Sequence, residues 1–316
     1  MSNDLAGMRR KIGSAEELHS VVRTMKAMAA SNIGQYERAM RALADYDRAV
    51  ELGLGACFRQ LAAAGHAARA EGAAGEGGGI VGAVVFGSDQ GLVGQFNETV
   101  AAHAAQFLAS SPGPVLVWAV GEQVYARLAD SGVRLMGLFA VPASIRSIGV
   151  LVGRILTQVE MRMERGGGHQ LELFYNSSAA GAVYAPVRRR MLPLDEDWRR
   201  RLLATPWPTA NLPEVLAGRD ATLRALLREY LFISLFRASA ESLASENASR
   251  LAAMERADRN IDELLEKLHR NFQRVRQTGI DDELFDVISG YEALPPNGNG
   301  GGAAKPRADG SARRGG

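Results

Sequence analysis

Residues 5–61 read LAGMRRKIGSAEELHSVVRTMKAMAASNIGQYERAMRALADYDRAVELGLGACFRQL, and their apolar residues keep one regular spacing. Alternate steps of three and four residues from Leu5 reach an apolar residue at every step except His19, Lys26 and Asp47. The full series is Leu5, Met8, Ile12, Ala15, His19, Val22, Lys26, Ala29, Ile33, Tyr36, Met40, Leu43, Asp47, Val50, Leu54, Cys57 and Leu61. A mean spacing of about 3.5 residues over about eight heptads is typical of a left-handed coiled-coil seam.

A second seam with the same spacing runs from Leu223 to Val275, with Arg237, Asn247 and Asp258 as its polar exceptions, and it loosens at Gly279. The two series predict long helices over roughly residues 5–61 and 221–289. At about 1.5 Å per residue, these helices are about 85 Å and about 100 Å long. We expect them to pair with each other as an antiparallel coiled coil.

Many seam positions carry small or polar side chains, which weaken pairing compared with a seam of Leu and Ile. They are Ala15, Lys26, Ala29, Arg237, Ala240, Ala244, Asn247 and Asp258. The coil is therefore expected to need support from outside. Gly7, Gly13 and Gly34 also fall inside the first helix, where each indicates either local bending or close approach of another chain.

The middle of the chain alternates between predicted strands and helices. After a Gly-rich linker at 62–79, strands are expected at 80–86, 115–120, 133–139, 170–176 and 182–193, and helices at 122–130 and 144–165, with Asn97 capping a further helix over 98–110. This order predicts a central Rossmann-like α/β/α domain with a mainly parallel sheet. Residues 194–220, which contain three prolines, are expected to lead back to the second long helix.

The predicted organisation therefore has five parts: a coiled-coil helix at 1–61, the linker at 62–79, the α/β domain at 80–215, a second coiled-coil helix at 216–290 and a disordered tail at 291–316. The tail is Gly-rich and basic, and it carries no apolar residue larger than Ala after Leu294. The fold class is thus α/β with long terminal helices.

Composition excludes several classes of protein. The 37 Lys and Arg residues nearly balance the 35 Asp and Glu residues, so there is no basic excess that would indicate nucleic-acid binding. A single cysteine, Cys57, cannot form an internal disulfide, and its apolar helix position indicates a packing role. No apolar run is long enough for a membrane span, and the first residues lack the apolar stretch of a signal peptide.

No catalytic, cofactor or metal site is predicted. The loop GSDQGLVGQFN at 87–97 follows a strand, where nucleotide-binding loops usually lie, but it has neither Walker nor dinucleotide spacing, so it is interpreted as a structural turn. The five histidines are scattered without metal-ligand spacing. Ser88 and Asp89 lack a nucleophile-elbow pattern. Two clusters, Arg188–Arg190 and Arg199–Arg201, are either solvated surface or contacts for an acidic subunit or anionic headgroups.

Four separated regions resemble the gamma subunit of the rotary (F-type) ATP synthases. VVRTMKAMAAS at 21–31 resembles the family's I-T-K-A-M-K-M-V-A-A-S, and the loop at 87–97 resembles G-S-D-R-G-L-C-G-G-F-N. ESLASENASRLAAM at 241–254 resembles E-x-L-A-S-E-x-A-A-R-M-x-A-M, and RQTGI at 276–280 followed by ELFDVISG at 283–290 resembles the family's C-terminal end. The chain departs from the pattern at Asn32, Val93, Gln95 and Asp281.

The resemblance implies a central-stalk rotor that carries no active site and couples proton or sodium translocation to ATP synthesis or hydrolysis. It implies as partners the catalytic and non-catalytic subunits of the ATPase hexamer, an epsilon-type subunit and the membrane c-ring, at the cytoplasmic face of the cell (inner) membrane without direct insertion. Positions matching Met25, Lys26, Arg250, Gln277 and Asp281 are the implied partner contacts. A coiled-coil adaptor and an enzyme with helical arms are the competing hypotheses.

Overall fold

A computed structural model describes residues 2–63, 79–163, 170–211, 213 and 218–292. The two longest elements are α1 (Ser2–Ala63) and α6 (Arg219–Glu292), so both predicted long helices are confirmed. The second helix passes through Gly279, where the seam loosens, without ending. The predicted linker and tail fall almost entirely on residues 64–78 and 293–316, which lie outside the described residues.

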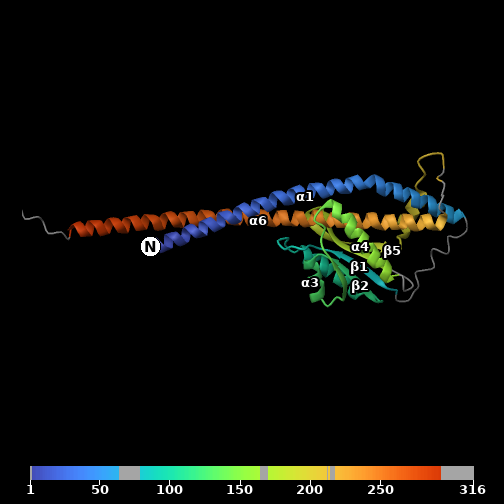
Figure 1. Cartoon of the computed structure of the whole chain (residues 1–316), viewed down its shortest axis with the longest axis horizontal. Helices are drawn as coiled ribbons and strands as arrows, with labels where there is room; N and C mark the ends of the chain where they lie inside the picture. The colour runs from blue at the N-terminus through green and yellow to red at the C-terminus, as the bar shows by residue number, and fades with distance from the viewer. Residues whose placement is uncertain (1, 64–78, 164–169, 212, 214–217, 293–316) are drawn as a thin grey trace, which may run out of the picture. The chain divides into compact units, whose positions relative to one another are not determined.

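The described chain divides into two compact units. One unit holds Glu17–Asp262, and the other holds the ends of the chain, Met1–Glu16 and Glu263–Gly316. In the first unit, α1 and α6 run side by side in opposite directions, since Asp47 contacts Arg237 and Lys26 contacts Asp258 (Figure 1). In the second unit, the guanidinium carbon of Arg9 lies 5.5 Å from the ring centroid of Phe272. The predicted antiparallel pairing is thus observed in the Glu17–Asp262 unit.

A five-stranded sheet forms the centre of the α/β domain in the order β3-β2-β1-β4-β5. Its strands are β1 (Val81–Phe86), β2 (Val115–Val120), β3 (Leu135–Phe139), β4 (Gln170–Ala179) and β5 (Ala182–Leu192). The first four strands are parallel to one another, and β5 runs antiparallel beside β4. The prediction of a mainly parallel sheet is therefore confirmed.

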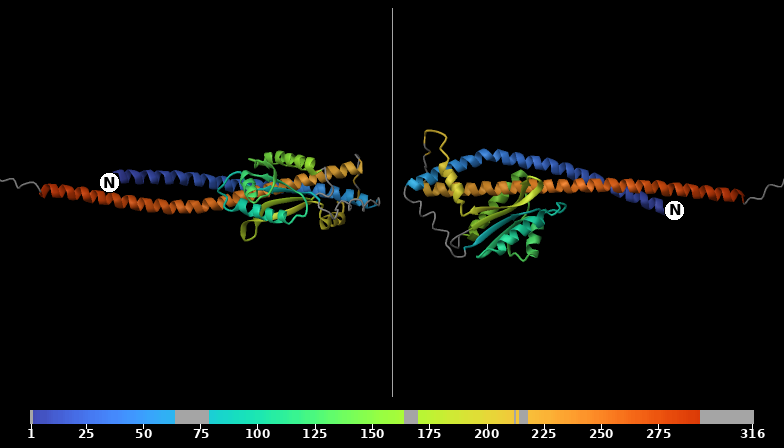
Figure 2. Two further views of the ribbon diagram at one scale, coloured as in Figure 1. Left: turned by 90° about the horizontal axis from the view of Figure 1, so that it is seen from below. Right: turned by 180° about the vertical axis from the view of Figure 1, so that it is seen from behind.

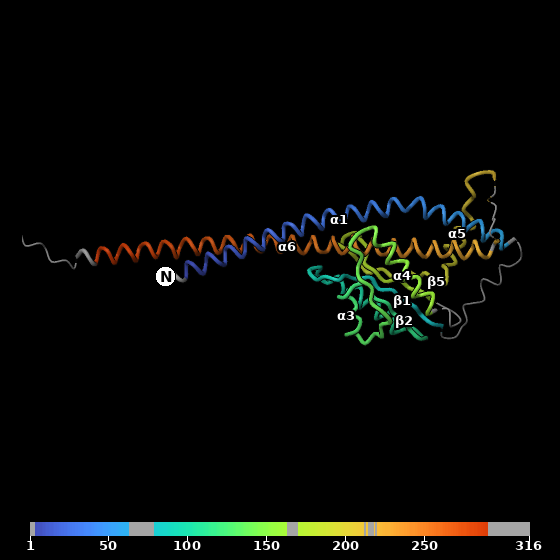
Figure 3. The backbone as a smooth tube through the Cα atoms, viewed as in Figure 1, coloured from blue at the N-terminus to red at the C-terminus, as the bar shows by residue number. Residues whose placement is uncertain are grey.

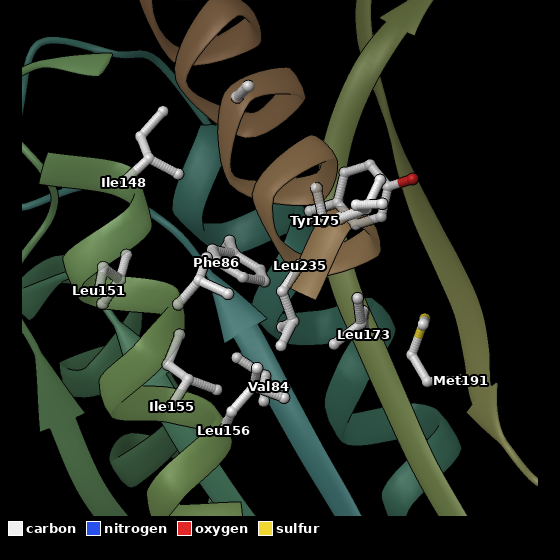
Figure 4. Close-up of a cluster of buried hydrophobic side chains, with 14 of the residues drawn as sticks. Val84, Phe86, Ile148, Leu151, Ile155, Leu156, Leu173, Tyr175, Met191 and Leu235 are labelled. Carbon is white, nitrogen blue, oxygen red and sulfur yellow. The ribbon is translucent and has the colours of Figure 1, made fainter. Parts of the chain in front are cut away.

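The two faces of the sheet bury different partners because strand side chains alternate between faces. Val84 and Phe86 of β1 face α4 (Ile145–Met163), α1 and α6, whereas Ala83 and Val85 face α2 (Phe96–Ala109) and α3 (Glu122–Asp130). Figure 4 shows Leu235 of α6 pointing into the first cluster. Helices thus cover both faces, and the parts of α1 and α6 within the Glu17–Asp262 unit lie along one side of the domain (Figure 2).

The structure has a helix, α5 (Glu196–Ala204), within residues 194–220, where no element was predicted. Asp195 caps it by accepting a hydrogen bond from the Trp198 backbone N–H at 2.9 Å. The apolar periodicity of nine residues is too short to have indicated it among the prolines that follow. Figure 3 places α5 beside the end of α1.

Polar and steric contacts hold α5 against α1. The Arg59 guanidinium donates to the carbonyl oxygens of Leu202, Leu203 and Thr205 at 3.4, 3.3 and 2.7 Å. These carbonyls lie at the C-terminal end of α5, where the Leu202 oxygen also accepts from the Thr205 backbone N–H, and a cation is favourable at such an end. Gly55 permits this approach, because a Cβ there would lie 2.8 Å from the Leu202 oxygen.

Candidate partner-binding surface

The five implied contact residues fall in both units. Met25 and Lys26 on α1 and Arg250 on α6 belong to the Glu17–Asp262 unit, and Gln277 and Asp281 belong to the other. Gln277 and Asp281 are exposed, whereas the other three are partly buried. The two exposed residues are therefore more accessible to a partner than the three partly buried ones.

Lys26 lies in the seam and is already paired. Its ammonium donates to the Asp258 carboxylate at 2.8 Å, and the side chain remains 35 % exposed. His19 approaches the other Asp258 oxygen at 2.9 Å. The hydrogen bond from Lys26 is the largest influence that lowers the pKa of Asp258. Lys26 therefore serves the pairing of α1 with α6 first, and only its outer part faces solvent.

Arg250 is held within its own helix. Its guanidinium donates to Glu246 at 2.6 Å, and the two side chains are only 13 % and 7 % exposed. Burial raises the pKa of Glu246, against the opposing attraction of Arg250. A partner that binds Arg250 directly must compete with this covered ion pair.

Met25 belongs to an apolar stripe on α1 that the sequence analysis missed. Leu18, Val21 and Met28 are 59 %, 55 % and 61 % exposed, and Met25 lies between them at helical spacing. Their heptad spacing was visible in the sequence one position before the seam, but only the structure shows that α6 leaves them uncovered. Exposed apolar side chains aligned on one helix face are typical of an interaction site.

A second exposed apolar group surrounds Asp281 near the end of α6. It comprises Ile280, Leu284, Phe285, Val287 and Ile288, of which Phe285 and Val287 are 68 % and 70 % exposed. Four of these residues, all except Ile280, belong to the segment ELFDVISG that carried part of the resemblance. Gln277 lies one turn before this group on the same helix.

The 87–97 loop uses its polar groups internally. The prediction that Asn97 caps α2 is wrong, because the helix begins at Phe96 and Gln95 occupies the cap position. Instead, Asn97 exchanges two hydrogen bonds with Ser88, at 2.9 and 2.8 Å, and Asp89 accepts from the backbone N–H groups of Glu122 and Val141. The loop is thus a turn that joins three elements of the domain.

The same loop is fixed to α6. Ser249 donates to the carbonyl oxygen of Val93 at 2.5 Å, and this contact is buried. Leu92 and Gly94 on either side have positive φ angles of 61° and 59°, a conformation that costs energy for leucine. The loop is therefore held in a strained shape against the helix that bears Arg250.

Two further features bear on the kind of site. Within the described residues, no group of three or more His, Cys, Asp or Glu side chains has an arrangement that could hold a metal ion. Across the same ranges, no helix has both the length and the apolar character needed to cross a membrane.

Comparison with known proteins gives the class of protein. The family described as ATP synthase matches residues 4–294, and the chain belongs to this family. Relatives include the "ATP synthase gamma chain" of Clavibacter sepedonicus, 29 % identical over 93 % of this chain and 99 % of the relative. The protein of the same name from Polynucleobacter necessarius is 25 % identical over 91 % and 98 %. The predicted resemblance to the gamma subunit is confirmed.

Solved structures show the same fold. A chain of the Euglena gracilis mitochondrial ATP synthase (OSCP/F1/c-ring) has a TM-score of 0.58 at 15 % identity, covering 93 % of this chain and 95 % of that one. A chain of the Tetrahymena thermophila mitochondrial ATP synthase (central stalk/c-ring) has a TM-score of 0.51 at 18 % identity, covering 75 % and 99 %. Long helices beside an α/β domain are thus shared with these complexes.

Proposed function

We infer that this chain is the central-stalk rotor subunit of an F-type ATP synthase. The observation that carries the inference is the match of the ATP synthase family to residues 4–294, over a fold of two long antiparallel helices beside an α/β domain. An adaptor protein accounts for the helices but not for full-length likeness to gamma chains.

The subunit is proposed to be non-catalytic. Three polar side chains of the 87–97 loop, those of Ser88, Asp89 and Asn97, hydrogen-bond to the protein itself in the segment where a nucleotide is usually bound. The chain then contributes shape and contacts, while catalytic and non-catalytic subunits of the hexamer carry the nucleotide chemistry. Coupling depends on how the rotor surface differs from one side to another as it turns.

The surfaces divide the proposed partners. The hexamer subunits contact α1 and α6, and an epsilon-type subunit and the c-ring are the further proposed partners. The protein would then be peripheral, at the cytoplasmic face of the cell membrane, and turned by protons or sodium ions. The apolar stripe with Met25 and the exposed group around Asp281 support the first assignment, because such side chains gain most from being covered.

Co-purification tests the assignment. The tagged full-length chain should retain a hexamer with ATPase activity together with a small epsilon-type subunit. A homodimer that retains no ATPase would contradict the proposal. Binding of ATP or NAD by the isolated chain at micromolar concentration would contradict the non-catalytic assignment separately.

The contact residues are tested by coupling. Arg250→Ala and Gln277→Ala are each expected to leave assembly nearly intact but to lower the number of ions pumped per ATP hydrolysed. Exposed neighbours on the same helix, Arg256→Ala and Gln273→Ala, serve as matched controls. Unchanged coupling in both test variants would remove these two residues from the contact surface.

A further inference from the structure

The polar residues that interrupt the two seams meet each other. Lys26 on α1 contacts Asp258 on α6 at 2.8 Å, and Asp47 on α1 contacts Arg237 on α6 at 2.6 Å. These side chains are between 16 % and 35 % exposed, so both pairs are partly buried. Residues that weaken an apolar seam in the sequence are thus partners across the coil.

The signs and the spacing of these charges are complementary only when the two helices are antiparallel. The separation is 21 residues in each helix, from Lys26 to Asp47 and from Arg237 to Asp258, which is three heptads. Each helix carries the cation first and the acid second. Opposite charges therefore meet at both positions only when the helices are antiparallel; a parallel pair at this spacing would place Lys26 beside Arg237 and Asp47 beside Asp258.

Other antiparallel registers lose the match. A shift of one heptad would place Lys26 opposite Leu251 or Leu265, where its charge would be partly buried without a partner. A shift of three heptads would bring Asp47 against Asp258, or Lys26 against Arg237. Each alternative either leaves charges unpaired or brings like charges together, and both are unfavourable.

Two neighbouring contacts belong to the same set. Between the ion pairs, the Asn32 amide donates to Asn247 at 3.3 Å. His19 lies one heptad before Lys26 and contacts Asp258 at 2.9 Å. A shift of one heptad in one direction would keep His19 opposite Asp258, but it would still separate Asp47 from its partner.

We propose that the Lys26–Asp258 and Asp47–Arg237 pairs form a charge code that sets the direction and the register of the α1–α6 pair. A buried polar residue that fixes register at a cost in stability is an established device in coiled coils. The code stops α1 from sliding along α6. The benefit of a fixed register during rotation rests on the proposed rotor function. The effect of the two ion pairs on register does not depend on that function.

The test uses the full chain with Cys57 replaced by Ser and cysteine pairs that report register. Asn32→Cys is combined with Asn247→Cys for the observed register, and with Met254→Cys or Ala240→Cys for a shift of one heptad in either direction. Such a shift moves one helix by about 10.5 Å, so a short thiol cross-linker separates the three. With native charges, only the 32/247 pair should cross-link.

Charge reversal then decides the proposal. Asp47→Arg should lower the 32/247 yield by at least about tenfold, because it leaves Arg237 partly buried beside a like charge. Asp47→Arg combined with Arg237→Asp should restore it. Asp45→Arg, an exposed position outside the seam, makes the same charge change and should have no effect.

Two results would overturn the charge code. One is a full 32/247 yield in Asp47→Arg, which would mean that apolar packing alone fixes the register. The other is a double reversal that cross-links as poorly as the single one. If Asp47→Arg does not fold, the double reversal still carries the test. Co-purification with a hexamer is a separate measurement, so failure of the rotor assignment remains distinguishable.

Discussion

The ammonium of Lys26 lies 2.8 Å from the carboxylate of Asp258, although 232 positions separate the two residues in the sequence. This contact joins the two ends of the chain within the Glu17–Asp262 unit, and with His19 it lowers the pKa of Asp258 below its usual value of 3.8. The stability of the helix pair should therefore depend on pH in a direction that follows from this shift.

A folded-state pKa below the unfolded value means that ionised Asp258 stabilises the folded chain above about pH 4, and that this contribution is lost as pH falls through the folded value. We expect Asp258→Asn to lower the melting temperature at pH 7 by a few degrees. The difference from the unmodified chain should shrink as the pH falls below about 4. Thermal unfolding at several pH values measures this, and a difference that stays constant down to pH 3 would be contrary to it.

The apolar stripe on α1 should matter for assembly and not for folding. Leu18→Ser combined with Met28→Ser changes two side chains that are 59 % and 61 % exposed, so the melting temperature should be nearly unchanged. Binding of the hexamer should weaken by roughly tenfold or more, since covered apolar contacts are lost. Leu54→Ala, at a fully buried position, is the opposite control and should cost about 2–5 kcal/mol of stability.

Phe285 offers a matching experiment near the end of α6. Its side chain is 68 % exposed, so Phe285→Ser should leave helix content and melting temperature nearly unchanged while weakening retention of the hexamer. Glu283→Ser alters an exposed polar neighbour on the same helix and should retain the hexamer normally. Equal retention by both variants would show that the apolar group near Asp281 is not a contact.

Asn97 should be a stability residue of the loop. It is 4 % exposed and makes two hydrogen bonds with Ser88, so Asn97→Ala leaves buried polar groups unpaired and should cost about 1–3 kcal/mol. Chemical denaturation measures the loss. Asn271→Ala, at an exposed helix position, should change stability by less than about 0.5 kcal/mol.

The long helices and the order of strands could be predicted because both depend on local periodicity. The spacing from Leu5 to Leu61 fixes which face of α1 is apolar, whatever its partner is. The role of Asn97 could not be found in this way, because it depends on a contact with Ser88 that folding creates. α5 was missed because nine residues carry little periodic signal.

The surface of the coil was the least predictable feature. Lys26 and Arg250 were implied contacts, yet each forms an ion pair with an acidic residue of this chain. Leu18 and Met28 remain exposed, which only the structure shows. The pairing of Asp47 with Arg237 could have been predicted from the sequence. Aligning the two seams in opposite directions would have revealed equal spacing and opposite signs.

Arg59 has a mechanical consequence. Its three carbonyl contacts attach the C-terminal part of α1 to α5, while Trp198 of α5 stacks on Tyr230 of α6 with ring centroids 4.5 Å apart. Both long helices are thereby anchored to one short element. Under the proposed role, a torque applied to the domain would reach both helices through this joint as well as through the buried core that they share with β1 and α4, so the two helices would twist together and not bend about a hinge between them.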